Sequence, residues 1–257
     1  FVTILTWCQK SGVNNFTNGY DPYVAWTFRK KSGFFDCLTY SGDGTSNRQI
    51  SHSLGSNPAM IIIKVTNGSD EWYVYHTSLG YTNRLALNST GATDSLYPPV
   101  SASTDTTFTV VEPTGVNTSG STYVAYLFAD NSSEDAEDQM IKCGSYTGVG
   151  TGAVEVNLGW EPQFVILKNA SRASTDWAMF DTMRGMSHTG YNRLRPNTSS
   201  AENVSTGNLV VPTATGFTIN NNGSNNYGQS GDQMIYMVIR APMMVEPEAA
   251  TDVFMPA

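Results

Sequence analysis

Short apolar runs, separated by polar turns, recur along the chain, and one such run is present three times. Its clearest copy is Tyr123–Phe128, and the other two are Tyr23–Phe28 and Met234–Ile239. Aromatic and β-branched side chains fill most of these positions. They favour a buried strand over a helix, because bulky side chains pack well on a pleated surface. Three copies predict that three repeat units end in the same strand.

The sequence that precedes Tyr123–Phe128 is itself repeated roughly one hundred residues later, before Met234–Ile239. Leu54–Lys64 matches Leu158–Lys168, and Trp72–Tyr75 matches Trp177–Phe180. Three further matches keep the same order, and they begin at Tyr40, Leu85 and Phe108 and recur at Tyr146, Leu194 and Phe217. Short strands with Gly, Asn and Pro between them indicate an all-β fold of tandem β-sandwich-like domains, each of about 100 residues.

The repeat predicts four segments along the chain. Residues 1–30 are expected to be the C-terminal part of a preceding repeat, 31–130 the first full β-repeat, 131–241 the second full β-repeat, and 242–257 an extended C-terminal tail. The chain opens at Phe1 without a start Met and closes one repeat within 28 residues. We therefore expect it to derive from a longer protein.

Short runs at regular spacing, with Gly, Asn and Pro between them, place the expected strands within each unit. Pro98-Pro99 and the Ser/Thr-rich stretch 101–107 are interpreted as a long surface loop. No stretch shows a sustained helical apolar period. The expected strands lie near residues 1–9, 23–28, 34–41, 47–53, 59–66, 71–76, 84–88, 106–111, 122–128, 140–146, 153–158, 163–169, 176–181, 192–195, 216–220 and 233–240.

Charge argues against nucleic-acid binding, and the lengths of the apolar runs argue against membrane insertion. The net charge is −8 and the isoelectric point is about 4.8, whereas binding to nucleic acid needs a basic patch that neutralises phosphates. The sequence also holds no run of roughly 18 apolar residues of the kind that crosses a membrane. We therefore expect neither nucleic-acid binding nor membrane insertion.

The three cysteines, Cys8, Cys37 and Cys143, do not form a pattern typical of disulfides or zinc. Cys37 and Cys143 occupy equivalent repeat positions, which predicts a buried, reduced structural thiol in each unit. We expect no disulfide between them, no metal site and no cofactor.

Candidate catalytic groups are few. The histidines His52, His76 and His188 lack the i, i+4 spacing of a zinc protease, and no nucleophile elbow or phosphate loop is present. A pair of carboxylates could cleave glycosidic bonds as acid and base, so the acids around the Trp-containing strands were considered; they are Asp70, Glu71, Asp176 and Asp181. Charge at strand ends is ordinary, so we expect no catalytic residue. The acidic run Glu134–Asp138 is interpreted as a solvated linker rather than a cation site.

Tryptophans supply the remaining candidates. Trp72 and Trp177 are repeat-equivalent, which favours core packing, since a core position must be filled in every copy. Trp160 replaces Ser56 in a turn before a proline. We therefore predict that Trp160 is an exposed contact residue.

Several motifs resemble a repeat family found in tail fibre and virion structural proteins of marine tailed phages. The motifs are Tyr23–Arg29, Gly33–Asp36, Ile50–Gly55, Ile141–Gly148 and Ile235–Pro242, and together they span most of the chain. The resemblance implies a place in the virion and a homo-oligomer, with a trimer typical of fibres. It implies no catalytic residues.

Two classes of function therefore compete. The first is a non-enzymatic tail fibre or surface fibre component, located on the phage particle after synthesis in the bacterial cytoplasm, whose partners are other virion proteins and a host surface glycan or receptor. The alternative is a carbohydrate-binding or polysaccharide-depolymerising module. A capsid decoration protein would share these sequence features with a fibre.

Overall fold

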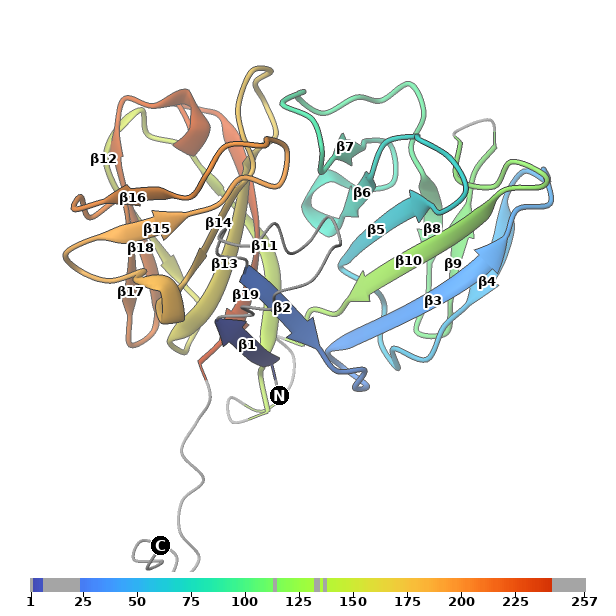
Figure 1. The fold of residues 1–257 in the computed structure, drawn as a ribbon, viewed down its shortest axis with the longest axis horizontal. Helices are drawn as coiled ribbons and strands as arrows, with labels where there is room; N and C mark the ends of the chain where they lie inside the picture. Colours follow the sequence, from blue (N-terminus) through green and yellow to red (C-terminus); the bar gives the residue numbers. More distant parts are fainter. Residues whose placement is uncertain (1, 7–23, 113–114, 132–134, 136–137, 242–257) are drawn as a thin grey trace, which may run out of the picture.

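The computed structural model describes residues 2–6, 24–112, 115–131, 135 and 138–241. These residues form 19 β-strands and three 3-10 helices of three residues each, all joined by turns and loops (Figure 1). The predicted all-β, sandwich-like fold class is therefore confirmed.

Two successive sets of strands make up most of the fold. The first unit contains β3 (Phe35–Ser41), β4 (Arg48–Ser51), β5 (Met60–Val65), β6 (Tyr73–His76), η1 (Thr77–Leu79), β7 (Leu85–Ala86), β8 (Val100–Ser103), β9 (Thr107–Val110) and β10 (Thr122–Phe128). The second unit contains β11 (Ile141–Thr147), β12 (Thr151–Asn157), β13 (Pro162–Asn169), β14 (Ala178–Asp181), η2 (Thr182–Arg184), β15 (Tyr191–Arg193), β16 (Asn203–Ser205), β17 (Val210–Thr213), β18 (Gly216–Asn222), η3 (Asn225–Tyr227) and β19 (Gln233–Arg240).

The two units share one strand connectivity. The large sheet of the first unit has the order β3-β10-β5-β6-β7, and that of the second has the order β11-β19-β13-β14. A bridge between Met179 and Leu194 adds the counterpart of β7, because Leu194 matches Leu85. The small sheets, β4-β9-β8 and β12-β18-β17, also correspond. Tandem repetition predicts this agreement in strand connectivity. The exact boundary between the two units stays a prediction.

The last strand of each unit, β10 or β19, is called its closing strand. Both closing strands lie inside their large sheets, with a paired strand on each side. Side chains of β10 therefore divide between the two faces of the sheet. Tyr123, Ala125 and Leu127 are fully buried, whereas Val124 and Tyr126 on the other face are half-buried. Each large apolar side chain that is fully buried contributes about 1.5–3 kcal/mol to the free energy of unfolding.

Three strands were missed by the sequence-based prediction. Residues 101–107, interpreted as a surface loop, contain most of β8 and the start of β9, and β16 and β17 were also unassigned. β8 reads Val-Ser-Ala-Ser and β16 reads Asn-Val-Ser. These short polar strands lie at sheet edges. β8 and β16 each contain one large apolar residue, Val100 and Val204, so they carry little apolar signal. β17 (Val210–Thr213) is apolar and buried, but it is only four residues long and contains a proline, which weakens its strand pattern.

The units are joined by a continuous hydrophobic core. One cluster of buried residues combines Met60, Tyr75 and Phe128 of the first unit with Trp177 and Met237 of the second. Hydrogen bonds cross the same contact. The indole Nε1 of Trp177 donates to the carbonyl of Ala86 at 2.9 Å. The Thr93 amide donates to the Ala170 carbonyl at 2.9 Å, and the Thr175 amide donates to Thr90. The two units are thus packed as one body.

A hairpin of β1 (Val2–Thr6) and β2 (Val24–Phe28) lies between the units at the lower centre of Figure 1. Phe28 packs against Phe35 and Phe128 of the first unit, with ring centroids 5.4 and 5.7 Å apart. Trp26 packs edge-on against Phe164 of the second unit at 5.9 Å. This first copy of the closing strand therefore contacts both units.

Polar contacts stabilise the segment that precedes each unit. Asn131 is buried, and its side-chain oxygen accepts hydrogen bonds from the amides of Met140 and Ile141 at 3.0 Å each. Before the first unit, Lys30 forms an ion pair with the buried carboxylate of Asp36 at 2.9 Å. Burial raises the pKa of Asp36, but hydrogen bonds from the Ser53 amide and Lys30 oppose this and lower it overall.

Candidate functional site

Trp160, the residue predicted to be an exposed contact, is buried. Its side chain is 2 % exposed and lies in the core of the second unit with Phe217 and Val238. Its Nε1 donates to Gln139 Oε1 at 3.1 Å, so the polar edge is also occupied inside the chain. The prediction was wrong because a tryptophan in a turn was assumed to face solvent, whereas its large apolar ring system packs among core residues of the second unit.

The cysteines follow the prediction in part. Cys37 and Cys143 are both free thiols, as expected. Cys143 is buried, and burial raises its pKa well above the usual range. Cys37 is only half-buried, which corrects the prediction that both would be buried. Cys8 lies outside the described residues.

His76 has a structural role. Its ring is 1 % exposed, Nδ1 accepts from the Ser78 amide at 3.2 Å, and Nε2 contacts the Tyr236 carbonyl of the second unit at 3.0 Å. Complete burial lowers its pKa to about 4, with the bond to Tyr236 opposing the shift. Neutral His76 thus caps η1 and links the two units.

His52 is also held by the backbone, while His188 is exposed. The Leu54 amide donates to His52 Nδ1 at 3.2 Å, and Nε2 contacts the Thr104 carbonyl at 3.2 Å. Burial lowers the pKa of His52. His52 therefore stabilises the turn after β4 and does not face an open site.

Asp181, the counterpart of His76, is fully buried. Its Oδ1 accepts from the Arg184 amide and caps η2, and its Oδ2 accepts from Arg184 Nε at 2.6 Å and from Trp26 Nε1 at 3.3 Å. The Arg184 guanidinium lies 5.1 Å from the Trp26 ring centroid and also pairs with Glu202. These charges hold the β1–β2 hairpin against η2.

Two of the other acids considered for catalysis, Asp70 and Asp176, are likewise engaged. Asp70 Oδ1 accepts from the Glu71 amide at 2.8 Å and from the Tyr73 hydroxyl at 2.9 Å. Asp176 accepts from Arg195 at 3.0 Å and from Asn197 at 2.8 Å. Asp70 is thus held within its own turn, Asp176 is tied to the segment after β15, and none of these bonds links two carboxylates. The described residues contain no group of three or more metal-ligating side chains.

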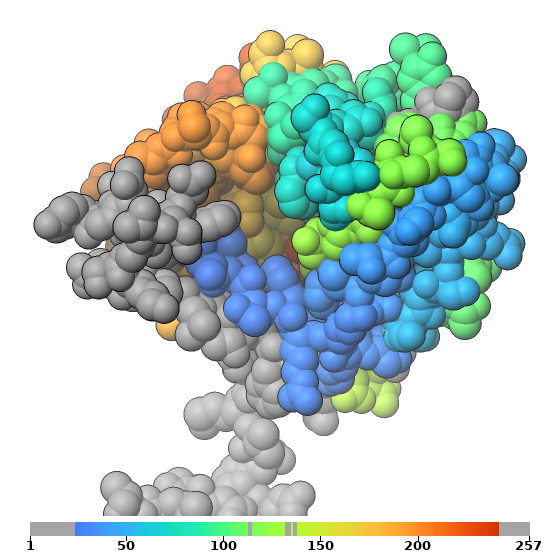
Figure 2. Space-filling view, turned by 45° about the vertical axis from the view of Figure 1, so that its right-hand side comes forward, coloured from blue at the N-terminus to red at the C-terminus, as the bar shows by residue number. Residues whose placement is uncertain are grey.

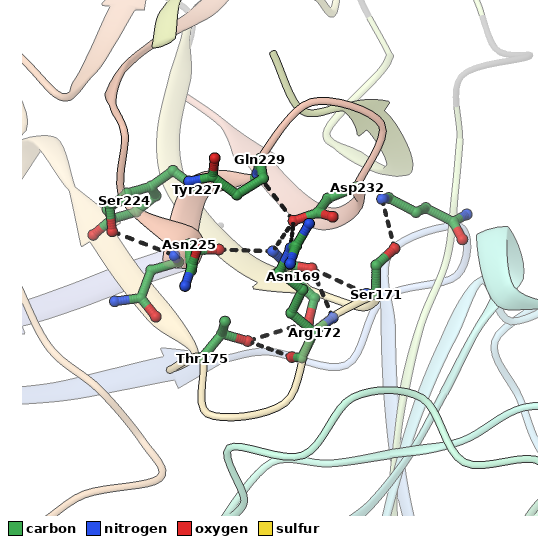
Figure 3. A network of polar contacts seen from close by, with 12 residues as sticks. Asn169, Ser171, Arg172, Thr175, Ser224, Asn225, Tyr227, Gln229 and Asp232 are labelled. Atoms are coloured by element: carbon green, nitrogen blue, oxygen red, sulfur yellow. Dashed lines mark hydrogen bonds and ion pairs between the residues drawn. The ribbon is translucent and has the colours of Figure 1, made fainter. Parts of the chain in front are cut away.

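Figure 3 shows a polar network that the sequence-based reasoning did not identify. It joins the loop after β13 to the loop before β19. Asp232 Oδ2 accepts from Asn169 Nδ2 at 2.9 Å, from Arg172 Nε at 2.6 Å and from the Gln229 amide at 2.9 Å. Burial raises the pKa of Asp232, but these hydrogen bonds outweigh it and lower the pKa overall.

The same network continues to Lys168. The Lys168 ammonium is buried and donates to the carbonyl and hydroxyl of Thr175 at 2.9 and 2.7 Å. Burial lowers its pKa to about 8. Its repeat equivalent, Lys64, donates to the Asp70 carbonyl at 2.6 Å. Both lysines therefore fasten the turn after the central strand, and the network stabilises loops rather than offering a reactive group. The sequence gave no signal that Asp232 and Arg172, which lie in separate loops, would meet beside Asn169.

An exposed aromatic loop in the first unit is the remaining candidate. Among the described residues, five large hydrophobic side chains are exposed, and two of them are adjacent: Leu96 at 75 % and Tyr97 at 46 %. The Arg84 guanidinium lies 4.9 Å from the Tyr73 ring centroid and 6.0 Å from that of Tyr97. Its Nη2 forms an ion pair with Asp94 Oδ2 at 3.1 Å.

This loop is held in place by its backbone. The amides and carbonyls of Arg84 and Asp94 exchange hydrogen bonds of 2.8 and 3.1 Å, and the Leu96 amide donates to Asp94 Oδ1 at 2.8 Å. The sequence indicated a loop around Pro98-Pro99 but did not single out Tyr97. A tyrosine directly before two prolines was the available signal, because proline restricts the backbone of the residue before it.

The chain belongs to a protein family described as a domain of unknown function, DUF7483, whose match covers residues 2–241. No curated protein and no solved structure matches the chain. Within the described residues, no helix is long and apolar enough to cross a membrane.

Proposed function

We propose that this protein is a structural component of a bacteriophage particle, a tail fibre or surface fibre element that acts in assembly and host-surface attachment without catalysis. Its partners would be other virion proteins, further copies of the chain and a glycan or receptor on the host. The proposal begins from the sequence motifs that resemble phage fibre repeats.

The observation that carries the proposal is the shared core of the two units. Tandem domains joined by flexible linkers move relative to one another, whereas these units bury Trp177, Met237 and Cys143 against one another and share cross-unit hydrogen bonds. A fibre transmits contact at its tip to the particle, and packed repeat units give it the required stiffness.

The engagement of the candidate acids and histidines supports a non-enzymatic role. General acid–base catalysis requires a side chain that can reach a substrate. Asp181, His52 and His76 are instead buried and bonded within the chain. A polysaccharide-depolymerising module is the competing proposal, and the exposed Tyr97 loop is the observation that favours a carbohydrate contact.

Imaging of phage particles tests the proposal. Antibodies against this chain should label tail fibres or surface fibres in electron micrographs of purified particles. Labelling of the capsid shell alone would assign the chain to capsid decoration, and absence from purified particles would refute the proposal. Incubation of the protein with host surface polysaccharide should release no reducing ends; their release would establish the depolymerase instead.

A further inference from the structure

The Tyr97 loop has the features of a small, preformed contact site. An exposed ring of 46 % and a neighbouring leucine of 75 % stand on a loop whose backbone is bridged between Arg84 and Asp94. Exposed apolar side chains that stand side by side on a rigid loop often mark a binding surface. Because the loop is already ordered, little conformational entropy is lost when a ligand binds.

The chemistry of this loop fits a sugar. The face of an aromatic ring is electron-rich, so it packs favourably against the C–H bonds on the apolar face of a pyranose. The Arg84–Asp94 pair beside the ring supplies donors and acceptors for hydroxyl groups in a fixed orientation. The Asp94 side chain is 36 % exposed, so its carboxylate is accessible from solvent.

Size and charge restrict the class of ligand further. A stable protein–protein interface buries about 800 Å² on each partner, far more than two side chains provide. The Arg84–Asp94 pair is neutral overall and the chain carries a net charge of −8, which disfavours acidic ligands.

A single site of this size binds weakly, but weak sites become effective when many copies act together on one surface.

The second unit provides an internal contrast. The pair Arg84 and Asp94 corresponds to Arg193 and Asn203, which face each other in the β15–β16 hairpin. There the carboxylate is replaced by an amide, Arg193 bonds the buried Tyr227, and the exposed side chain is the aliphatic Val204. The equivalent hairpin therefore lacks both the exposed ring and the ion pair.

We propose that Tyr97, together with Arg84 and Asp94, forms a contact site for neutral hexose-containing oligosaccharides. This inference rests on the proposed role in host attachment and names the ligand class of that role. Tyr97 stacks on the sugar ring with the face that Arg84 does not cover, and the Arg84–Asp94 ion pair beside Tyr97 binds hydroxyl groups.

Binding of the full chain to immobilised oligosaccharides tests this site. The array should display neutral gluco-, galacto- and manno-oligosaccharides beside uronic-acid oligosaccharides, and saturation-transfer NMR should measure affinity for those retained. We expect wild type to bind neutral members, Tyr97→Ala to lower the affinity about tenfold or more, a loss of at least about 1.4 kcal/mol, and Tyr97→Phe to retain most of it. Val204→Ala, in the equivalent hairpin, should bind as wild type does.

The variants should be folded, because Tyr97 and Val204 are both exposed, and matching thermal melts would verify this. Absence of binding to every neutral oligosaccharide, binding confined to uronic acids, or equal binding by Tyr97→Ala would each overturn the site. The particle-labelling experiment is independent of these outcomes. A chain found on fibres that binds no sugar would refute this inference alone.

Discussion

The two units place the same sheet face in different surroundings. In the second unit this face packs against the first unit, so that Cys143, Trp177 and Met237 are 4 %, 1 % and 4 % exposed. In the first unit the equivalent positions are Cys37, Trp72 and Tyr126, and all three are only half-buried. The blue and green side chains of β3 and β10 form part of the surface visible in Figure 2.

This difference shows that identical side chains at equivalent repeat positions can differ in burial. Trp72 and Trp177 were both expected to be core residues. Trp177 buries its ring and donates to Ala86 of the neighbouring unit, whereas Trp72 stacks on Tyr126 at a centroid distance of 6.4 Å and an interplanar angle of 18°. The neighbour, not the repeat position, decides how much of the ring is covered.

At the capping positions of the 3-10 helices, the two units have different residues with the same role. His76 and Asp181 are equivalent and chemically different, yet each caps the 3-10 helix that follows it. Either side chain can accept the backbone hydrogen bond. Their second contacts differ, because His76 binds the other unit while Asp181 binds Arg184 and Trp26.

Replacing the two tryptophans should give the largest effect and the most direct test of the comparison. Trp177→Ala should lower the free energy of unfolding by about 3–5 kcal/mol, because it opens a cavity in the shared core. Trp72→Ala should cost about 1–2 kcal/mol, because only part of its ring is buried. Chemical denaturation of both variants measures the difference. Equal losses would mean that the two faces are buried alike.

Acid should destabilise the contact between the units through His76. In the unfolded chain this histidine titrates near 6.5, and in the folded chain its pKa is about 4. The unfolded state therefore binds more protons between these values, and stability falls as pH drops from 6.5 towards 4. The expected loss is about 3 kcal/mol.

His76→Asn serves as the comparison for that titration. Asparagine retains a capping oxygen but cannot be protonated in this range. Denaturation at a series of pH values should show a shallower loss of stability for His76→Asn than for wild type between pH 6.5 and 4. Parallel curves would assign the acid sensitivity to other groups.

Thiol reactivity should reveal the smallest difference between the faces. In a Cys8→Ser background, a thiol reagent should label Cys37 in the native protein, while Cys143 should react only when the chain unfolds. Burial raises the pKa of both thiols, and it does so to a greater degree at the fully buried Cys143. Mass spectrometry after timed labelling separates the two sites. Equal labelling rates in the native protein would contradict the burial of Cys143.

The sequence by itself determined the fold class, the repeat and most strands. β10 and β19 have the bounds that the sequence predicted, because each is a short apolar run rich in aromatic and β-branched side chains. The equivalence of Lys64 and Lys168 was also visible, and both lysines proved to fasten the same turn. Such features depend on the order of neighbouring residues, which the sequence contains directly.

Only the tertiary structure decided which faces are covered and which polar groups meet. Trp160 is buried because it packs in one core with Phe217 and Val238, and Asp232 bonds Arg172 because two loops distant in sequence lie against each other. The exposure of Tyr97 likewise depends on the bridge between Arg84 and Asp94. Contacts of this kind arise from packing between segments far apart in the sequence, and local periodicity carries no record of them.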